Sequence, residues 1–283
     1  MATAERGDPV PSPQAKLTIR GLRTRAVRVP LRRPLGTSGG TIAHAPLVLI
    51  DLETEEGVPG RAYLFAYSDV GARTLRQLLA EGFRAVKLRL GRKTLWEDVV
   101  ATRAVRAKIP DEALLMTDFN QALTVAEALA RGRALDRERV YWIEEPVRHD
   151  DYAGAARIAR EVETPIQIGE NFLGTRAMAA AIAAGAADYV MPDLGRIGGV
   201  TGWLRAAALA DAAGLEMSSH LHPEVSAQLL AVTPSAHFLE YVDWAVPILA
   251  RPLEIADGQA LPAEAPGAGL DWNEEAVARF ALD

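Results

Sequence analysis

The sequence predicts an α/β protein in which a (β/α) barrel follows a small, mostly antiparallel β unit. From residue 83 onward, short apolar runs alternate with alanine-rich helical stretches, and this alternation is typical of βαβ units that build a parallel sheet. Before residue 68 the runs instead alternate apolar and polar residues, as half-buried antiparallel strands do. Seven runs of the first kind favour a barrel, with an open doubly wound sheet as the alternative.

Residues 16–76 are expected to form the antiparallel unit, and residues 1–15, which are polar and contain proline, a flexible tail. The segment Arg32–His44 is rich in Gly, Ser and Thr and shows no periodicity, so it is predicted to be a loop. The strands of the unit are predicted in KLTIRGLRTRAVRVPL, APLVLIDLETEEG and RAYLFAY, and one short helix in ARTLRQLLA.

Residues 77–260 are expected to form the barrel, and residues 261–283 a C-terminal segment that packs back on the antiparallel unit. The predicted barrel strands are FRAVKLRL, ALLMTDF, VYWIEEP, PIQIGEN, DYVMPDL, LEMSSHL and HFLEYV. The predicted helices between them are TLWEDVVATRAVRAKI, TVAEALARGRAL, YAGAARIAREV, TRAMAAAIAAG and GGVTGWLRAAALADAAG.

Composition narrows the function. The 283 residues carry a net charge of −6, so the basic surface of a nucleic-acid-binding protein is not expected. There is no cysteine, which excludes disulfides, zinc–thiolate sites and thiol nucleophiles. Because no apolar run is long enough to span a bilayer, the expectation is a cytoplasmic enzyme without a membrane partner.

Three carboxylates stand at the ends of consecutive predicted strands. Asp118, Glu144 and Glu170 are separated by 26 residues each, one βα unit apiece, and a barrel would bring all three to its C-terminal rim. Converging carboxylates repel one another unless a cation lies between them, and oxygen ligands without His or Cys suit Mg²⁺. The alternative is that each acid caps the following helix. Glu145 is interpreted as facing away from the site or capping a helix.

A histidine and an aspartate end two later strands. His220 follows MSS and Asp193 follows VMP, and a neighbouring carboxylate can hold an imidazole in one tautomer and increase its basicity. The pair is therefore a candidate general base. His222 either lines the pocket or is simply exposed.

Two cations share one side of the first predicted barrel strand. Lys87 and Arg89 are two residues apart in AVKLRLG, so their side chains point in the same direction. They are candidates for binding a substrate carboxylate, and one of them for a second base; salt bridges to neighbouring acids are the alternative. Glu240, on the last predicted strand, would donate a hydrogen bond if protonated and is otherwise an ordinary rim acid.

Taken together, these residues resemble the mandelate racemase group of the enolase superfamily. The stretches GLRTRAV, APLVLIDL, YLFAY, GFRAVK, WIEEP, IGGVTGW and SSHL carry the resemblance. It implies a modified TIM barrel with an α+β capping domain, in which Arg32–His44 is a specificity loop. It also implies Mg²⁺ ligation by the three strand-end carboxylates. The implied catalytic residues are His220, Asp193, Lys87, Arg89 and Glu240, and the implied substrate-binding residues are Asn120, Leu35, Thr37, Tyr63 and His222.

The implied chemistry is removal of the proton next to the carboxylate of a 2-hydroxy acid, through an enediolate stabilised by the metal, Lys87 and Glu240. Dehydration of an acid sugar or racemisation of a mandelate-like acid would follow. The group would work as a homo-oligomer on a small hydroxy-carboxylate.

The sequence departs from the group's pattern in two places. Where the group has the second Lys of a Lys-x-Lys pair this chain has Arg89, and arginine stays protonated, so dehydration with one base is favoured over racemisation with two. Between Tyr67 and Phe83 lie only fifteen residues, which leaves no room for several cap helices and the first barrel strand. A catalytically impaired or inactive remnant is therefore the alternative to an active enzyme.

Overall fold

A computed structural model describes residues 18–37, 40–56, 60–65, 80–242, 245–246, 249–264, 270 and 272–275, with backbone only for the parts of 22–52 and 60–65 within these ranges. The chain divides into two compact units, residues 1–77 and 78–283. The predicted helix ARTLRQLLA lies outside the described residues except for its last position.

The first unit contains a three-stranded sheet of order β1-β2-β3, formed by β1 (Ile19–Thr37), β2 (Gly40–Thr54) and β3 (Gly60–Phe65). Both pairings are antiparallel, with Ala26 opposite Val48 and Leu49 opposite Tyr63. The alternating strands predicted for this region are confirmed.

The prediction of a loop over Arg32–His44 is wrong for most of that segment. Pairing between β1 and β2 continues to Leu35 opposite Ile42 and Thr37 opposite Gly40, with a register shift between Pro30 and Leu35. Proline has no N–H to donate to a ladder, and both Pro30 and Pro34 fall at this shift. The Gly, Ser and Thr content of the segment hid its strand signal, and the prolines interrupt the hairpin without ending it.

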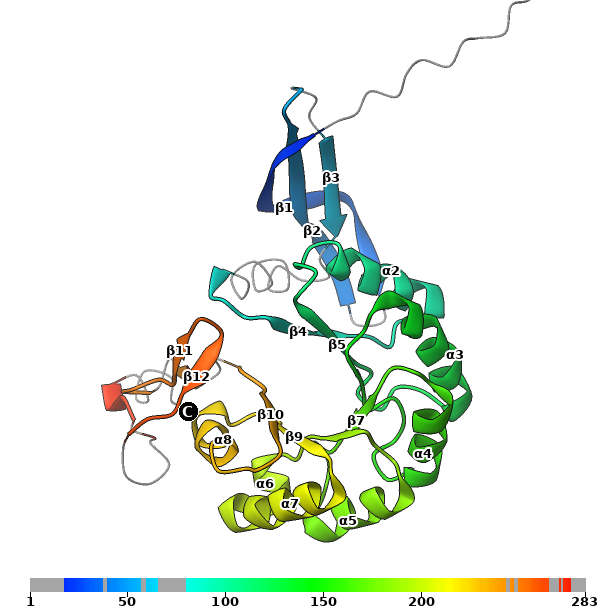
Figure 1. Cartoon of the computed structure of the whole chain (residues 1–283). Helices are drawn as coiled ribbons and strands as arrows, with labels where there is room; N and C mark the ends of the chain where they lie inside the picture. The colour runs from blue at the N-terminus through cyan, green and yellow to red at the C-terminus, as the bar shows by residue number, and fades with distance from the viewer. Residues whose placement is uncertain are drawn as a thin grey trace, which may run out of the picture. The chain divides into compact units, whose positions relative to one another are not determined.

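The second unit is built on a curled sheet of seven parallel strands in the order β10-β9-β8-β7-β6-β5-β4 (Figure 1). Every neighbouring pair is parallel. Each of the seven predicted barrel strands overlaps one of these strands, so that prediction is confirmed. The strands are β4 (Ala85–Arg89), β5 (Leu114–Asp118), β6 (Ile143–Glu144), β7 (Ile166–Ile168), β8 (Tyr189–Val190), β9 (Glu216–Ser219) and β10 (Ala236–Leu239).

Helices cover the outer, convex side of this sheet (Figure 1), which distinguishes it from a doubly wound sheet with helices on both faces. None of the described helices is long and apolar enough to cross a membrane. The helices are α2 (Leu95–Arg106), α3 (Val125–Leu135), a 3₁₀ turn (Asp136–Glu138), α4 (Tyr152–Glu161), α5 (Thr175–Ala184), α6 (Leu194–Ile197), α7 (Gly199–Ala213) and α8 (Pro223–Leu230).

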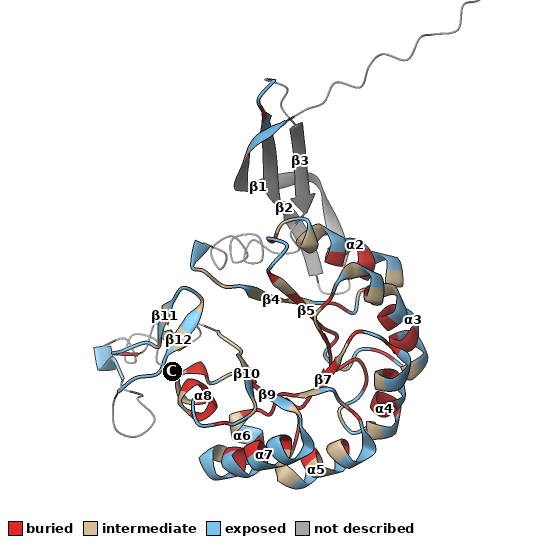
Figure 2. Cartoon of the chain, viewed as in Figure 1, coloured by how far each residue is buried: buried red, intermediate tan, exposed pale blue. Residues whose placement is uncertain are grey.

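Local sequence signals set where the helices begin. Thr94 and Thr124 cap α2 and α3, each in a reciprocal capping box with a glutamate three residues later, and Asp151 caps α4. These side chains accept hydrogen bonds from N–H groups that the helix itself leaves unpaired. The inward helix faces and the strands form one buried core (Figure 2).

The sheet does not close into a complete barrel. Within the described residues, β4 pairs only with β5 and β10 only with β9. A cavity of about 680 Å³ lies between these two edges, lined on one side by Phe83 and Ala85 and on the other by Phe238 and Leu239. The hairpin of β11 (Glu254–Ala256) and β12 (Gln259–Leu261) lines it as well. Over the part of the chain that the structure describes, the architecture is therefore an incomplete (β/α) barrel with seven strands.

Candidate metal and active site

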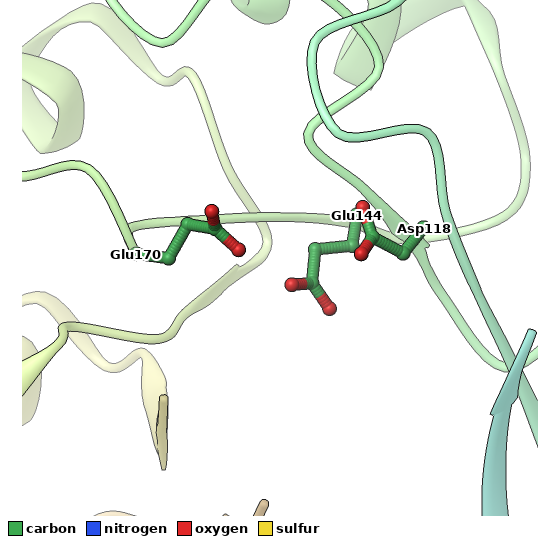
Figure 3. A group of neighbouring side chains, drawn as sticks. All are labelled: Asp118, Glu144 and Glu170. Atoms are coloured by element: carbon green, nitrogen blue, oxygen red, sulfur yellow. The ribbon is translucent and has the colours of Figure 1, made fainter. Parts of the chain in front are cut away.

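Three carboxylates meet at the C-terminal ends of neighbouring inner strands (Figure 3). Asp118 ends β5 and lies opposite Glu144 of β6 in the parallel ladder, while Glu170 follows β7 by two residues. One oxygen from each lies within 4.8 Å of the others, and the three side chains belong to residues that are 1–9% exposed. Figure 3 shows Glu170 reaching in from one side and the other two from the opposite side.

A glycine delivers Glu170 to this position. Gly169 has φ +143°, a backbone conformation that side chains other than glycine rarely adopt. A Cβ at this residue would lie 2.8 Å from the backbone N of Met191 on the neighbouring segment. The chain therefore needs glycine where it leaves β7, and this close approach points Glu170 inward.

The electrostatics of the cluster favour a bound cation. Burial raises the pKa of Glu144 to about 8; Lys87 opposes this rise, and repulsion by Asp118 and Glu240 adds to it. Keeping three buried carboxylates ionised so close together therefore costs free energy unless a positive charge compensates them. The three side chains offer carboxylate oxygens as ligands, which fit a hard divalent cation such as Mg²⁺.

Lys87 supplies part of that positive charge. Its ammonium lies 3.0 and 3.1 Å from the two oxygens of Glu144, 2.6 Å from Oε1 of Glu240 and 4.0 Å from Oδ2 of Asp118. Burial alone would lower the pKa of Lys87, but the three carboxylates together raise it above its usual value. Lys87 is therefore a firmly charged group that joins the metal cluster to the last strand.

Arg89 contacts a ligand of the cluster. Its Nη2 lies 3.3 Å from Oδ2 of Asp118, and its side chain is 65% exposed. This ion pair agrees with the alternative given above for Arg89, a salt bridge to a neighbouring acid. A side chain this exposed lies on the solvent side of the cluster.

The predicted His–Asp pair is formed in the structure. His220 Nδ1 lies 2.9 Å from Oδ2 of Asp193, and the two residues form an isolated parallel bridge. The Oδ1 of Asp193 also accepts the backbone N–H of Arg196 at the start of α6. Burial would raise the pKa of Asp193, but these hydrogen bonds lower it. Asp193 is thus an ionised acceptor that orients the imidazole.

The second nitrogen of His220 faces the carboxylates. Nε2 lies 3.5 Å from Oε2 of Glu170 and 3.9 Å from Oε2 of Glu240. If Nδ1 carries the proton donated to Asp193, Nε2 is left with a free lone pair. The imidazole is therefore aimed at the place where the metal ligands converge.

Glu240 is anchored on both of its oxygens. It accepts the backbone N–H of Leu221 at 3.0 Å and contacts Lys87, while its own N–H is donated to the Ser219 hydroxyl. Burial would raise the pKa of Glu240, but the contact with Lys87 lowers it below its usual value. In this arrangement Glu240 is a carboxylate, so the predicted role as a hydrogen-bond donor requires Lys87 to leave it.

The interpretation of Glu145 as an outward or helix-capping residue is wrong. Glu145 is only 1% exposed, and the helix that follows is capped by Asp151 instead. The Asn171 amide lies 3.0 Å from both Glu145 oxygens and 3.3 Å from Oε1 of Glu170. Glu145 adopts φ +39°, and this left-handed turn carries its side chain back into the protein, a reversal that strand alternation does not reveal.

Asn171 is a residue of the site that sequence reasoning missed. The available signal was an amide side chain directly after a strand-end carboxylate, in the run IGEN. The amide of Asn171 also acts on the charge of Glu145. Burial is the main reason that the pKa of Glu145 rises to about 7; the hydrogen bond from Asn171 counteracts this rise, whereas repulsion by Glu170 and Asp118 adds to it.

The remaining predicted residues are less central. Asn120 donates its backbone N–H to Asp118 at 2.7 Å, and its side-chain amide lies 3.4 Å from Glu170 Oε1. His222 is 52% exposed, with Nε2 3.9 Å from Asp193. The side chains of the other predicted substrate-binding residues, Leu35, Thr37 and Tyr63, lie outside the described part of the chain.

Two protein-family profiles match the chain. The profile described as "Enolase C-terminal domain-like" covers residues 71–276, and the one described as "Mandelate racemase / muconate lactonizing enzyme, N-terminal domain" covers residues 19–109. Together they span both compact units.

Individual relatives agree with these profiles. The chain is 33% identical to L-talarate/galactarate dehydratase of Salmonella typhimurium over 69% of its own length and 49% of the relative. It is 35% identical to 3,6-anhydro-alpha-L-galactonate cycloisomerase of Streptomyces coelicolor over 73% of its own length and 57% of the relative. The chain therefore spans about half the length of the curated relatives it matches.

A solved structure also matches. An enolase from Bradyrhizobium, complexed with magnesium and mandelic acid, has a TM-score of 0.70 and 35% identity, covering 95% of this chain and 100% of the other.

Proposed function

The chain belongs to the mandelate racemase / muconate lactonizing enzyme family of enolase-like proteins, and we propose that it is a Mg²⁺-dependent enzyme that removes the α-proton of a 2-hydroxy carboxylate. The observation that carries the proposal is the convergence of three buried carboxylates in front of His220. Relatives named as dehydratases, cycloisomerases and racemases, and a matching structure that holds magnesium, support it.

Asp118, Glu144 and Glu170 would hold the ion, and their oxygen donors fit Mg²⁺. When bound, the ion supplies positive charge to the carboxylate of the substrate and so makes the neighbouring proton more acidic. Positive charge at this position would also offset the burial, and the repulsion by Asp118 and Glu240, that raise the pKa of Glu144.

His220 is the proposed base. Asp193 holds Nδ1, which leaves Nε2 to accept the proton from the α-carbon. The electron pair of the broken C–H bond then moves into the carboxylate, giving an enediolate. In a dehydration the bond to the β-hydroxyl breaks, the proton on His220 returns to the departing oxygen as water, and the enol becomes a 2-keto acid.

Lys87 and Glu240 would stabilise the enediolate oxygens. A substrate carboxylate competes with Glu240 for the ammonium of Lys87, 2.6 Å away in this structure. Once Lys87 has moved to the substrate, Glu240 loses the contact that lowers its pKa and can take up a proton. Its predicted role as an acid is thereby coupled to substrate binding.

Dehydration of an acid sugar is favoured over racemisation. Racemisation needs a base on the opposite face of the α-carbon, and arginine, which does not deprotonate in proteins, stands at position 89. The guanidinium is moreover engaged with Asp118. His220 alone can complete a dehydration.

A catalytically inactive remnant is the second candidate function. The observation that favours it is the cavity between β4 and β10, across which the described residues form no backbone pairing. Lys87 and Glu240 come from these two edges, so the half of the site that would bind the substrate rests on the least supported strands.

Thermal unfolding with and without millimolar Mg²⁺ tests the proposal without knowledge of the substrate, because a ligand bound only by the native state raises its stability. The parent is expected to unfold at a higher temperature with Mg²⁺ than without it. The unfolding temperature of the Asp118→Asn variant is expected to be the same with and without Mg²⁺. A cooperatively unfolding parent that ignores Mg²⁺ would contradict the proposal and favour the remnant.

A panel of acid sugars and mandelate in D₂O then separates the reactions. A dehydratase yields a keto acid, and a racemase yields both enantiomers with deuterium at the α-carbon. If Mg²⁺ binds and no α-proton exchanges in any substrate, the inactive remnant becomes the better description.

A further inference from the structure

Glu145 is a buried carboxylate beside the metal ligands to which the proposed mechanism gives no role. It is as buried as its neighbour Glu144, at 1% exposure, and its backbone stands at φ +39°. A non-glycine residue in the left-handed region costs energy and persists where the surroundings demand it. Both features indicate that Glu145 has a structural or functional role inside the protein.

Its side chain has one described hydrogen-bond partner, the amide of Asn171. Nδ2 of Asn171 lies 3.0 Å from each Glu145 oxygen, and the same nitrogen lies 3.3 Å from Oε1 of Glu170. The nitrogen carries two hydrogens, so it can serve both carboxylates at once. The bidentate contact with Glu145 fixes the orientation of the amide, and the second hydrogen then points at Glu170.

We propose that Glu145 is a positioning residue that acts through the Asn171 amide to hold Glu170 in place as a metal ligand. The inference rests on the proposed function, since it assumes that Glu170 binds Mg²⁺.

Glu170 needs such support because it stands two residues beyond the end of β7, outside the ladder that fixes Asp118 and Glu144. The other amide near its side chain, Asn120, belongs to an exposed residue and lies at 3.4 Å. Repulsion among the carboxylates would turn Glu170 away from the cluster before the cation arrives. A fixed amide counteracts this and lowers the cost of assembling the site.

Two substitutions separate positioning from simple charge. Glu145→Gln removes the charge but keeps an oxygen that can accept from Asn171, whereas Glu145→Leu removes both. If Glu145 attracts the cation only through its charge, the two variants lose affinity equally. If it acts through the amide, Glu145→Gln stays close to the parent and Glu145→Leu loses about 10–100-fold in Mg²⁺ affinity, the range typical of groups that orient a metal ligand.

A double-mutant cycle then tests the route. Mg²⁺ affinity is measured by calorimetry for the parent, Glu145→Leu, Asn171→Ala and the double variant. Asn171→Ala is expected to weaken binding about as much as Glu145→Leu, and the double variant no further. Additive losses would overturn the proposal, as would equal losses for Gln and Leu at position 145.

Asp136→Ala is the matched control. Asp136 accepts hydrogen bonds from the backbone N–H and hydroxyl of Thr164, away from the cluster, so its loss should lower the unfolding temperature and leave Mg²⁺ affinity unchanged. If Glu145→Leu does not fold, the Mg²⁺ affinities of Asn171→Ala and Glu145→Gln still test the proposal, because only Asn171→Ala should bind Mg²⁺ more weakly than the parent. A parent without Mg²⁺ binding refutes the proposed function instead, whereas a binding parent with unaffected Asn171→Ala refutes only the positioning role.

Discussion

The inner strands and the edge strands of the curled sheet support different halves of the site. β5, β6 and β7 each have neighbours on both sides, and most of their residues are buried. Among the strands that the structure describes, β4 and β10 have one neighbour each, and most of their residues are only partly buried or exposed. Two metal ligands sit on the inner strands and the third follows one of them, whereas Lys87 and Glu240 belong to the edges.

Because of this difference, metal binding and substrate binding can be lost independently of each other. The backbone ladder places Asp118 opposite Glu144 whatever happens at the edges. The edges are joined instead by side chains, namely the Lys87–Glu240 ion pair and the rings of Phe83 and Tyr241, whose centroids lie 5.6 Å apart. Metal binding should therefore be robust, and substrate binding should depend on these contacts.

The largest effect is expected at an inner strand. Glu144→Gln should abolish stabilisation by Mg²⁺, because one of three ligand charges is lost. Without Mg²⁺ its unfolding temperature should equal or exceed that of the parent. Burial raises the pKa of Glu144 to about 8, so near neutral pH the folded protein must protonate a carboxyl that the unfolded chain leaves ionised. Thermal unfolding measures both effects. Retained stabilisation by Mg²⁺ would remove Glu144 from the ligand set.

Removing the bridge at the edges should have a different signature. Lys87→Met leaves Glu144 and Glu240 without their common cation, and it should destabilise the protein by about 1–3 kcal/mol in the absence of metal. Mg²⁺ affinity should hold or increase, because no ammonium competes for Glu144. Denaturant unfolding and calorimetry check the two parts. A loss of Mg²⁺ binding as large as that of Asp118→Asn would contradict the independence of the halves.

Hydrogen exchange can compare the two regions directly. The amides of Leu90, Phe119 and Met191 all donate to carbonyls of neighbouring strands at 2.8–3.0 Å, but only Leu90 follows the edge strand β4. Its amide should exchange at least about tenfold faster, which corresponds to opening that is about 1.4 kcal/mol easier. Equal protection of the three would mean that the edge is as stable as the interior.

The smallest effect is expected from restoring a lysine beside the cluster. Arg89→Lys should introduce slow epimerisation, detected as α-deuteration with inversion in D₂O. An exposed lysine with a pKa of about 10.4 is uncharged in roughly 0.1% of molecules near neutral pH, so the reaction should be slow and accelerate as the pH rises toward that value. An epimerisation rate that does not change with this substitution or with pH would contradict the hypothesis that Arg89 prevents racemisation.

Several features of this protein were predictable from local sequence. The strand–helix alternation predicts a parallel sheet, and the capping residues Thr94 and Thr124 mark where two helices begin. The 26-residue spacing of Asp118, Glu144 and Glu170 is likewise a local property, because parallel strands joined by helices bring their ends to one rim. The side-chain positions of Leu35, Thr37 and Tyr63, the assembly into homo-oligomers and the packing of residues 261–283 stay predictions.

Other features were decided by tertiary structure. Whether Glu145 faces outward depends on one backbone turn with positive φ and on the amide of Asn171 that meets it. The ionised state of Glu240 depends on Lys87, 153 residues away in the chain and 2.6 Å away in space.

Periodicity, capping and spacing act over short stretches of chain, so they specify which elements form and which chemical groups stand at their ends. The orientation and charge of those groups follow from contacts between segments that are far apart in the chain. Burial and the approach of residues from other strands set pKa values and hydrogen-bond partners, and neither is encoded in the neighbours along the chain.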